Sequence, residues 1–365
     1  MKFLSKFFPP KIVVENTGQN HGVEAGNNSG LIINNNGLTY SDTKALCYDI
    51  VSEELGKYKN EAYDEAEKRY NELFRLLIEK LDKNNMSDGA ALSEFKKPAM
   101  QYDYFEAQKS YIKAGTPEMA EVLSNVLLER ISESERTLLQ IALGEAIHTV
   151  PKLIKSQMAT LAMFFVLHHT KSLRINSHES FSDFLRNVIL KLYYHGVSKK
   201  FSEFQHLSSC GCGQISGFTV SFISDIRNTY GGIFMKGYLK DEIIASEDGQ
   251  PLYEKYPKLF TSCLNDKEKI QINAMSKKSL EEFFVSYNVN VDDQKIITKI
   301  FENNLMNVEE IKTLIIKLVP EMQEVIDYWA DGYISYLNLS SVGIIIGAQY
   351  SKLITQEDYD LHIWI

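Results

Sequence analysis

An Asn/Gly-rich tract near the start of the chain constrains its fold more than any other feature. Residues Asn16–Gly37 read NTGQNHGVEAGNNSGLIINNNG, and glycine recurs at every fourth position from residue 18 to residue 30. Glycine and asparagine are poor helix formers, and asparagine side chains compete for backbone hydrogen bonds. The tract therefore excludes a helix. Its short apolar stretches at 11–15 and 31–33 predict a β element instead.

The same tract predicts self-association, because it can bury almost nothing in a monomer. Repeated glycine lets backbones approach closely, and stacked copies can form asparagine ladders. We expect a homo-oligomer of three or more copies, since each added copy extends the ladders and a dimer leaves stacking edges open. The predicted oligomerisation residues are Gly18, Gly22, Gly26, Asn27, Asn28, Gly30, Asn34, Asn35 and Asn36.

Composition narrows the class of protein. Hydrophobic residues make up 44% of the 365 residues and charged residues 24%, as in globular proteins with a sizeable core. A net charge of −9 argues against nucleic acid as the main partner. No stretch reaches the ~18 apolar residues of a transmembrane helix, which argues against stable membrane insertion. Four cysteines without a disulfide framework indicate a reducing compartment, so we expect a cytoplasmic protein.

Apolar periodicity predicts a mainly α fold. A first helix at about 41–55 and a long helix at 61–83 with a nearly heptad apolar stripe form a predicted hairpin. Residues 205–250 are rich in small, then β-branched and aromatic residues, and predict a small β excursion. The expected domains are a leader at 1–37, an amphipathic hairpin at 38–85 and a helical body at 86–365.

Within the body, helices are expected wherever apolar residues recur at helical spacing between turn signals. Pro117 and Pro151 fit first-turn positions, and Ser134 lies in a segment that can cap a helix before Leu138. A buried helix is expected around Val342–Gly347, followed by a docked apolar end. The other expected helices are 101–113, 117–130, 134–148, 151–169, 180–194, 267–274, 277–286, 291–304, 307–318 and 320–330.

A cluster of histidines and cysteines is the main candidate for chemistry. Five of the eight histidines fall between residues 168 and 206, and imidazole and thiolate ligands together suit zinc. However, structural zinc sites use Cys-x₂-Cys pairs, whereas Cys210 and Cys212 bracket a single residue. Helix-end or surface positions explain the histidines equally well, so no cofactor is expected and zinc is the alternative. The candidate metal ligands are His168, His169, His206, Cys210 and Cys212.

Other catalytic signatures are missing from the sequence. There is no G-x-S-x-G motif, and the glycine-rich residues 211–217 lack the Lys-Ser/Thr pair of a P-loop. Arg174 and His178 are spaced too closely for the Arg/His motif of HEPN-type ribonucleases. No residue is therefore assigned a catalytic role.

Both ends of the chain resemble an uncharacterised family of bacterial proteins. The segment Gly37–Leu55, GLTYSDTKALCYDIVSEEL, follows the Asn/Gly tract as a Gly-Leu-Ser/Thr-Tyr-Ser-Asp helix start does in that family. The end, with Asp360, Leu361, Trp364 and Ile365, is similar to the Asp-Leu-x-x-Trp-Ile end of the same family. The resemblance implies a bacterial cytosolic setting and suggests phage defence or stress signalling. It brings no activity, cofactor or catalytic residue.

Three functional hypotheses follow. The leading one is a non-enzymatic, self-assembling interaction or sensor protein, in which the leader joins copies and the body binds a protein partner of unknown identity. The first alternative is a metal-dependent hydrolase or nuclease using the His168–Cys212 region. The second is a membrane-acting effector, with Met1–Phe8 as an interfacial anchor and Val342–Gly347 as an insertion element.

Overall fold

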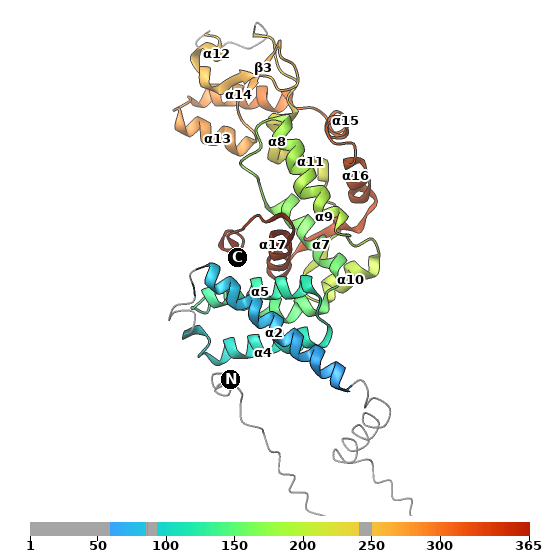
Figure 1. Ribbon diagram of the computed structural model, residues 1–365. Helices are drawn as coiled ribbons and strands as arrows, with labels where there is room; N and C mark the ends of the chain where they lie inside the picture. Colours follow the sequence, from blue (N-terminus) through green and yellow to red (C-terminus); the bar gives the residue numbers. More distant parts are fainter. Residues whose placement is uncertain (1–58, 85, 87–92, 241–249) are drawn as a thin grey trace, which may run out of the picture. The chain divides into compact units, whose positions relative to one another are not determined.

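The computed structural model describes residues 59–84, 86, 93–240 and 250–365 (Figure 1). The chain divides into two units, Met1–Lys59 and Asn60–Ile365, and the described residues belong almost wholly to the second. The Asn/Gly tract, all nine predicted oligomerisation residues and the helix expected at about 41–55 therefore lie outside the described residues.

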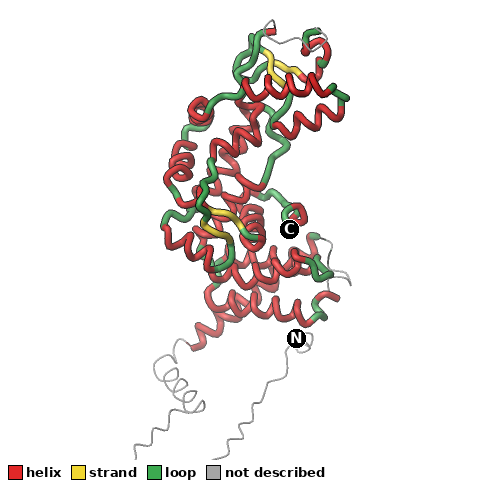
Figure 2. Tube along the Cα trace, turned by 180° about the vertical axis from the view of Figure 1, so that it is seen from behind, coloured by secondary structure: helices red, strands yellow, loops and turns green. Residues whose placement is uncertain are grey.

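The second unit is mainly helical, which confirms the predicted fold class (Figure 2). Two π-helical turns, Phe165–His169 and Leu185–Leu190, extend α7 and α8. The α-helices are α2 (Lys59–Lys83), α4 (Pro98–Ala114), α5 (Pro117–Ser132), α6 (Leu138–Thr149), α7 (Lys155–Phe164), α8 (His178–Phe184), α9 (Lys191–Tyr194), α10 (Phe201–Ser209), α11 (Phe222–Tyr230), α12 (Leu252–Lys255), α13 (Lys277–Ser286), α14 (Val291–Asn304), α15 (Val308–Leu318), α16 (Met322–Asp331) and α17 (Ser341–Thr355).

Helix starts follow local capping chemistry. Pro117 occupies the first turn of α5, and the Thr116 side chain accepts a hydrogen bond from a backbone N–H in that turn. Helix α6 begins after Thr137, whose hydroxyl accepts from the backbone N–H of Gln140 at 3.1 Å. The cap expected near Ser134 therefore lies three residues later, at Thr137, which is also a favoured N-cap residue.

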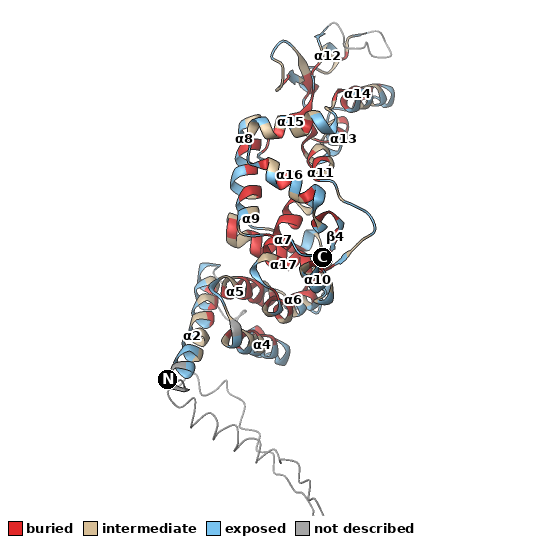
Figure 3. Cartoon of the chain, turned by 90° about the vertical axis from the view of Figure 1, so that its right-hand side faces the viewer, coloured by how far each residue is buried: buried red, intermediate tan, exposed pale blue. Residues whose placement is uncertain are grey.

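Helix α17 lies at the centre of the larger hydrophobic core. It packs against α5, α6 and α7, and most of it is buried (Figure 3). Ile345 and Ile346 are fully buried. A Cβ atom at Gly347 would lie 2.7 Å from the carbonyl oxygen of Leu161 in α7, so glycine is required for this close packing. The segment Val342–Gly347, one alternative's insertion element, is thus part of the protein core. None of the described helices has both the length and the apolar character needed to cross a bilayer.

Two small antiparallel sheets accompany the helices. Strand β1 (Gly213–Ile215) pairs with β4 (Leu337–Leu339), and β2 (Phe260–Ser262) pairs with β3 (Ile270–Ile272). The expected β excursion at 205–250 therefore contains β1, but its centre is helix α11, which Ser221 caps. The helix expected at 267–274 is wrong, because β3 lies within that stretch and pairs with β2 across the connection 263–269.

Residues 235–305 form an inserted module with a hydrophobic core of its own. Its described parts are 235–240 and 250–305, which include α12, β2, β3, α13 and α14 (Figure 1). The two segments that connect the module to the rest of the chain lie side by side. The Lys236 N–H donates to the Asn304 carbonyl at 2.9 Å, and the Met306 N–H donates to the Phe234 carbonyl at 2.8 Å. These two bonds define the neck of the module.

Candidate functional site

The candidate metal ligands fall in separate places: His168 and His169 lie in the π-helical turn after α7, whereas His206 lies in α10, and Cys210 and Cys212 follow α10. His206 of α10 contacts the Gln157 side chain, with its Nδ1 3.0 Å from the amide nitrogen. His168 follows Gln157 by eleven residues of continuous helix, which is roughly 16 Å at about 1.5 Å per residue. The structure therefore brings His206 near Cys210 and keeps His168 and His169 beside each other at the far end of α7. Among the described residues, no three His, Cys, Asp or Glu side chains gather in a group that could hold a metal ion.

His168 and His169 have opposite electrostatic environments although they are adjacent. The Nδ1 of His168 lies 3.1 Å from the Asp225 carboxylate, and this hydrogen bond raises the pKa of His168 above its usual value against the opposing effect of burial. Burial, together with the neighbouring His168, lowers the pKa of His169 to about 4. At neutral pH His169 is therefore an uncharged imidazole packed against Phe165.

Cys210, His206 and Gln157 line up in the order nucleophile, base and orienting group. The Cys210 Sγ lies 3.5 Å from the His206 Nε2, and Gln157 contacts the other ring nitrogen. However, burial raises the pKa of the Cys210 thiol, so the thiolate that nucleophilic catalysis requires is disfavoured. The backbone N–H groups of residues 210–212 already donate to carbonyls of α10 and are not free to stabilise an oxyanion.

Cys212 lies apart from these contacts, in the hydrophobic core at the entrance to β1. Its side chain is fully buried, and burial raises the pKa of its thiol to about 12. A thiol this basic is a poor metal ligand at neutral pH, because metal binding must displace its proton. The geometry therefore gives Cys212 a packing role.

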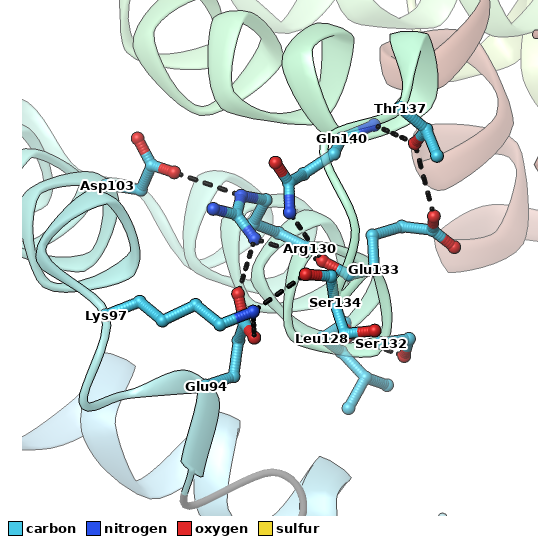
Figure 4. Close-up of polar contacts among 10 residues, drawn as sticks. All are labelled: Glu94, Lys97, Asp103, Leu128, Arg130, Ser132, Glu133, Ser134, Thr137 and Gln140. Atoms are coloured by element: carbon cyan, nitrogen blue, oxygen red, sulfur yellow. Dashed lines mark hydrogen bonds and ion pairs between the residues drawn. The ribbon is translucent and has the colours of Figure 1, made fainter.

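A buried polar cluster centres on Arg130 (Figure 4). The Arg130 guanidinium bonds the Asp103 carboxylate at 3.1 Å and the Glu94 carboxylate at 3.2 Å, and its side chain is only 3% exposed. Lys97 makes a second ion pair with Glu94 at 2.6 Å. Burial raises the pKa of Asp103 despite the nearby guanidinium.

This Arg130 cluster connects α4, α5 and the start of α6. The side-chain amide of Gln140 donates to the carbonyl of Glu133 at 2.7 Å, which ties the α5–α6 turn to the same cluster (Figure 4). Arg130 faces the carboxylates of both Asp103 and Glu94, so the cluster links the helices through paired buried charges.

An exposed apolar turn on the inserted module is the strongest candidate for a binding surface. Val285 in the last turn of α13 is 80% exposed, Tyr287 in the connection is 46% exposed, and Val291 at the start of α14 is 64% exposed. Isolated exposed apolar residues are ordinary, whereas here three fall within seven residues of the chain. We call Val285, Tyr287 and Val291 the apolar turn.

The apolar turn is held rigidly by its neighbours. The Tyr287 ring stacks on Phe283 with ring centroids 4.2 Å apart, and the Lys258 ammonium lies 5.5 Å from the Tyr287 centroid. Val289 in the same connection is buried in the module core. Asn288 adopts a positive φ of 48°, a conformation that asparagine tolerates better than most residues. A rigid aromatic side chain loses little entropy on binding, which suits a protein contact.

The apolar turn was not identified from the sequence. Val285 and Tyr287 have the composition of core positions, and the helical spacing of α13 does not tell which apolar residue is left uncovered. The only signal was the close run of Phe283, Val285, Tyr287 and Val291 around a turn.

Comparison with known proteins identifies a family. A protein-family model matches residues 37–365, beginning at the Gly-Leu-Thr-Tyr-Ser-Asp segment and leaving most of the Asn/Gly tract outside. No curated protein and no solved structure matches the chain.

Proposed function

The chain belongs to the uncharacterised protein family whose model matches residues 37–365, and from this premise we propose that it is a self-assembling interaction protein without catalytic activity. The Asn/Gly leader joins copies, and the helical body presents the inserted module to a protein partner. The apolar turn carries the proposal. Its three apolar side chains are exposed to solvent and add nothing to the hydrophobic core. Exposed apolar side chains that their neighbours hold in place suit a protein contact.

The geometry supports this proposal better than the metal-enzyme alternative. A hydrolase or nuclease would need the His168 pair and the His206–Cys210 pair to meet around one ion. They lie at opposite ends of α7, and His168 is already paired with Asp225. The bacterial setting and a role in phage defence or stress signalling remain part of the proposal.

Matched lysine variants test the binding role of the module. Val291 and Val308 are both exposed valines at the first position of a helix, α14 and α15 respectively, and only Val291 lies in the apolar turn. We expect Val291→Lys and Tyr287→Ala to abolish capture of protein partners from the native host by the full-length chain, while Val308→Lys retains it. Capture that survives both turn variants would contradict the proposal.

A charge variant of the leader tests self-assembly. Lysine at Asn27, Asn28, Asn34, Asn35 and Asn36 places like charges beside one another in every pair of copies, so we expect the assembly to dissociate to monomers. Native mass spectrometry and light scattering measure the copy number, and circular dichroism checks that the helical body stays folded. A control variant with lysine at the exposed residues Gln101 and Asn303 adds positive charge to the helical body and leaves the Asn/Gly tract unchanged, so it should keep its copy number. If the leader variant keeps its copy number, the leader is not what joins the copies.

A further inference from the structure

A surface pocket lies on the helical run that includes α8, the second π-helical turn and α9. It measures about 530 Å³, and its walls include Arg186, Lys191, Tyr194, His195 and Glu321. The first four come from one helical run, and Glu321 is the N-terminal cap of α16, which packs against the π-helical turn. Leu190 gives the pocket an apolar surface. A volume of this size suits a small metabolite.

The π-helical turn places the polar groups of this pocket on one face. Residues 185–190 wind with a wider turn than an α-helix, so Arg186 and Lys191 line the same pocket together with His195. Such turns are rare and occur frequently at functional sites. The distortion thus coincides with the pocket.

The two cations of the pocket are available for a ligand. Arg186 uses one guanidinium nitrogen to donate to the carbonyl of Leu318 at 3.0 Å, which fixes the side chain against the end of α15. Within the described residues, neither Arg186 nor Lys191 has a carboxylate within ion-pair distance. An arginine fork beside a lysine is the combination that binds a phosphate dianion well.

An unsatisfied polar group lies in the pocket wall and a second one lies behind it. The Nδ1 of His195 is buried and, among the described residues, has no hydrogen-bond partner. The His195 ring lies edge-to-face against Tyr350, which is fully buried and whose hydroxyl also has no partner in the described part of the chain. Buried polar groups are nearly always satisfied, so unsatisfied ones beside a pocket point to a ligand or to water. Burial, with Lys155 and Lys191 nearby, lowers the pKa of His195 and keeps the ring neutral.

We propose that this pocket binds a small phosphorylated metabolite that carries hydroxyl groups. Arg186 and Lys191 contact the phosphate, Tyr194 donates to it, and Glu321 accepts hydrogen bonds from the hydroxyl groups of the ligand. Glu321 would repel a phosphate backbone that continued past it, and the chain carries a net charge of −9, so a polynucleotide is disfavoured. This ligand site is independent of self-assembly and gives the body a sensing role beyond partner binding.

Titration of the full-length protein with four probes tests the proposal. The probes are inorganic phosphate, glycerol 3-phosphate, adenosine 5′-monophosphate and a single-stranded oligonucleotide. Calorimetry measures the binding of each probe at low millimolar probe concentration. We expect saturable binding of the two phosphate esters. We expect Arg186→Gln and Lys191→Gln each to weaken it about five- to tenfold, as for an ion contact that water reaches. Lys200→Gln, an exposed lysine outside the pocket, should leave the affinity unchanged.

A Glu321→Gln variant distinguishes the ligand from a phosphate group alone. It should weaken the esters, whose hydroxyl groups lose a charged acceptor, and slightly strengthen inorganic phosphate, which loses a repelling charge. Ester binding should also raise the pKa of His195 in an NMR titration, with His195→Asn identifying the signal. Arg186 also holds the end of α15, so the Arg186→Gln variant could unfold. In that case the Lys191→Gln variant alone provides the test. The proposal is overturned by three outcomes: no saturable ester binding, ester binding that Lys191→Gln leaves unchanged, or tighter binding of the oligonucleotide.

Discussion

Trp364 donates its indole N–H to the backbone carbonyl of His169, with the two atoms 3.0 Å apart. The ring packs edge-on against Phe165 and Tyr359 and retains partial solvent exposure. Residues 359–365 are thereby fixed to the π-helical turn that carries the adjacent histidines. The apolar end is docked, as its sequence indicates.

Replacing Trp364 by alanine should destabilise the fold by about 2 kcal/mol. A fully buried tryptophan would cost about 3–5 kcal/mol, but this ring is only half-buried. About 1 kcal/mol of the loss belongs to the indole hydrogen bond, so Trp364→Phe, which keeps most of the ring packing, should cost only that much. Urea unfolding of both variants measures the two free energies. Equal losses for Ala and Phe would show that packing contributes little.

His169 should make the protein sensitive to acid. Its pKa in the folded state, about 4, lies below the ordinary 6.5, so the fold favours the neutral ring. The stability that this residue contributes is therefore fully present above about pH 6.5 and decreases as the pH falls toward 4. The size of the effect is on the order of 2 kcal/mol, because solvent reaches part of the site. His169→Phe should flatten the dependence of the unfolding free energy on pH over this range.

His168 supplies the internal control, because its contribution to the unfolding free energy depends on pH in the opposite direction to that of His169. The hydrogen bond to Asp225 raises its pKa in the folded state. Its stabilisation is therefore full below the ordinary value of 6.5 and is lost as the pH rises through the raised pKa. His168→Gln should lower stability in mild acid and change little in alkali. If both histidine variants shift the pH profile in the same direction, these assignments are wrong.

Helix positions could be predicted from this sequence because capping and periodicity act locally. The expected bounds 277–286 and 291–304 coincide with α13 and α14, where Ser276 and Asn290 cap the first turns. The helix expected at 267–274 failed because β3 is determined by pairing with β2, which short-range patterns do not encode.

The candidate sites were harder to predict because they depend on which faces are covered. Histidines close in sequence are separated by the length of α7, whereas Arg186 and Glu321 line one pocket although they are far apart in the chain. The separate core of residues 235–305 was also missed. Its neck consists of backbone bonds between Phe234–Lys236 and Asn304–Met306, which leave no mark on composition.

Arg130→Leu should destabilise the protein by about 3–5 kcal/mol, because it leaves the Glu94 and Asp103 carboxylates buried without their partner. Lys97→Met removes the more exposed cation of the same cluster, 46% accessible, and should cost less than about 1 kcal/mol. Urea unfolding again measures both. A triple variant in which Glu94 becomes Gln, Asp103 becomes Asn and Arg130 becomes Leu should recover much of the loss, since no charge is then left unpaired. Failure to recover would mean that shape, not charge, makes Arg130 necessary.

The neck of the inserted module should loosen when Asn304 is replaced by alanine. Its side-chain amide accepts from the Gly237 N–H at 2.9 Å and donates to the Gly237 carbonyl at 3.2 Å, so the variant leaves two buried backbone groups unpaired. The expected cost is about 2–3 kcal/mol, confined to the module. Amide hydrogen exchange should therefore quicken in residues 250–305 and stay unchanged in α17. Asn303→Ala, an exposed neighbour on the same helix, is the matched control. Exchange that quickens equally in α17 would show that module and body unfold as one unit.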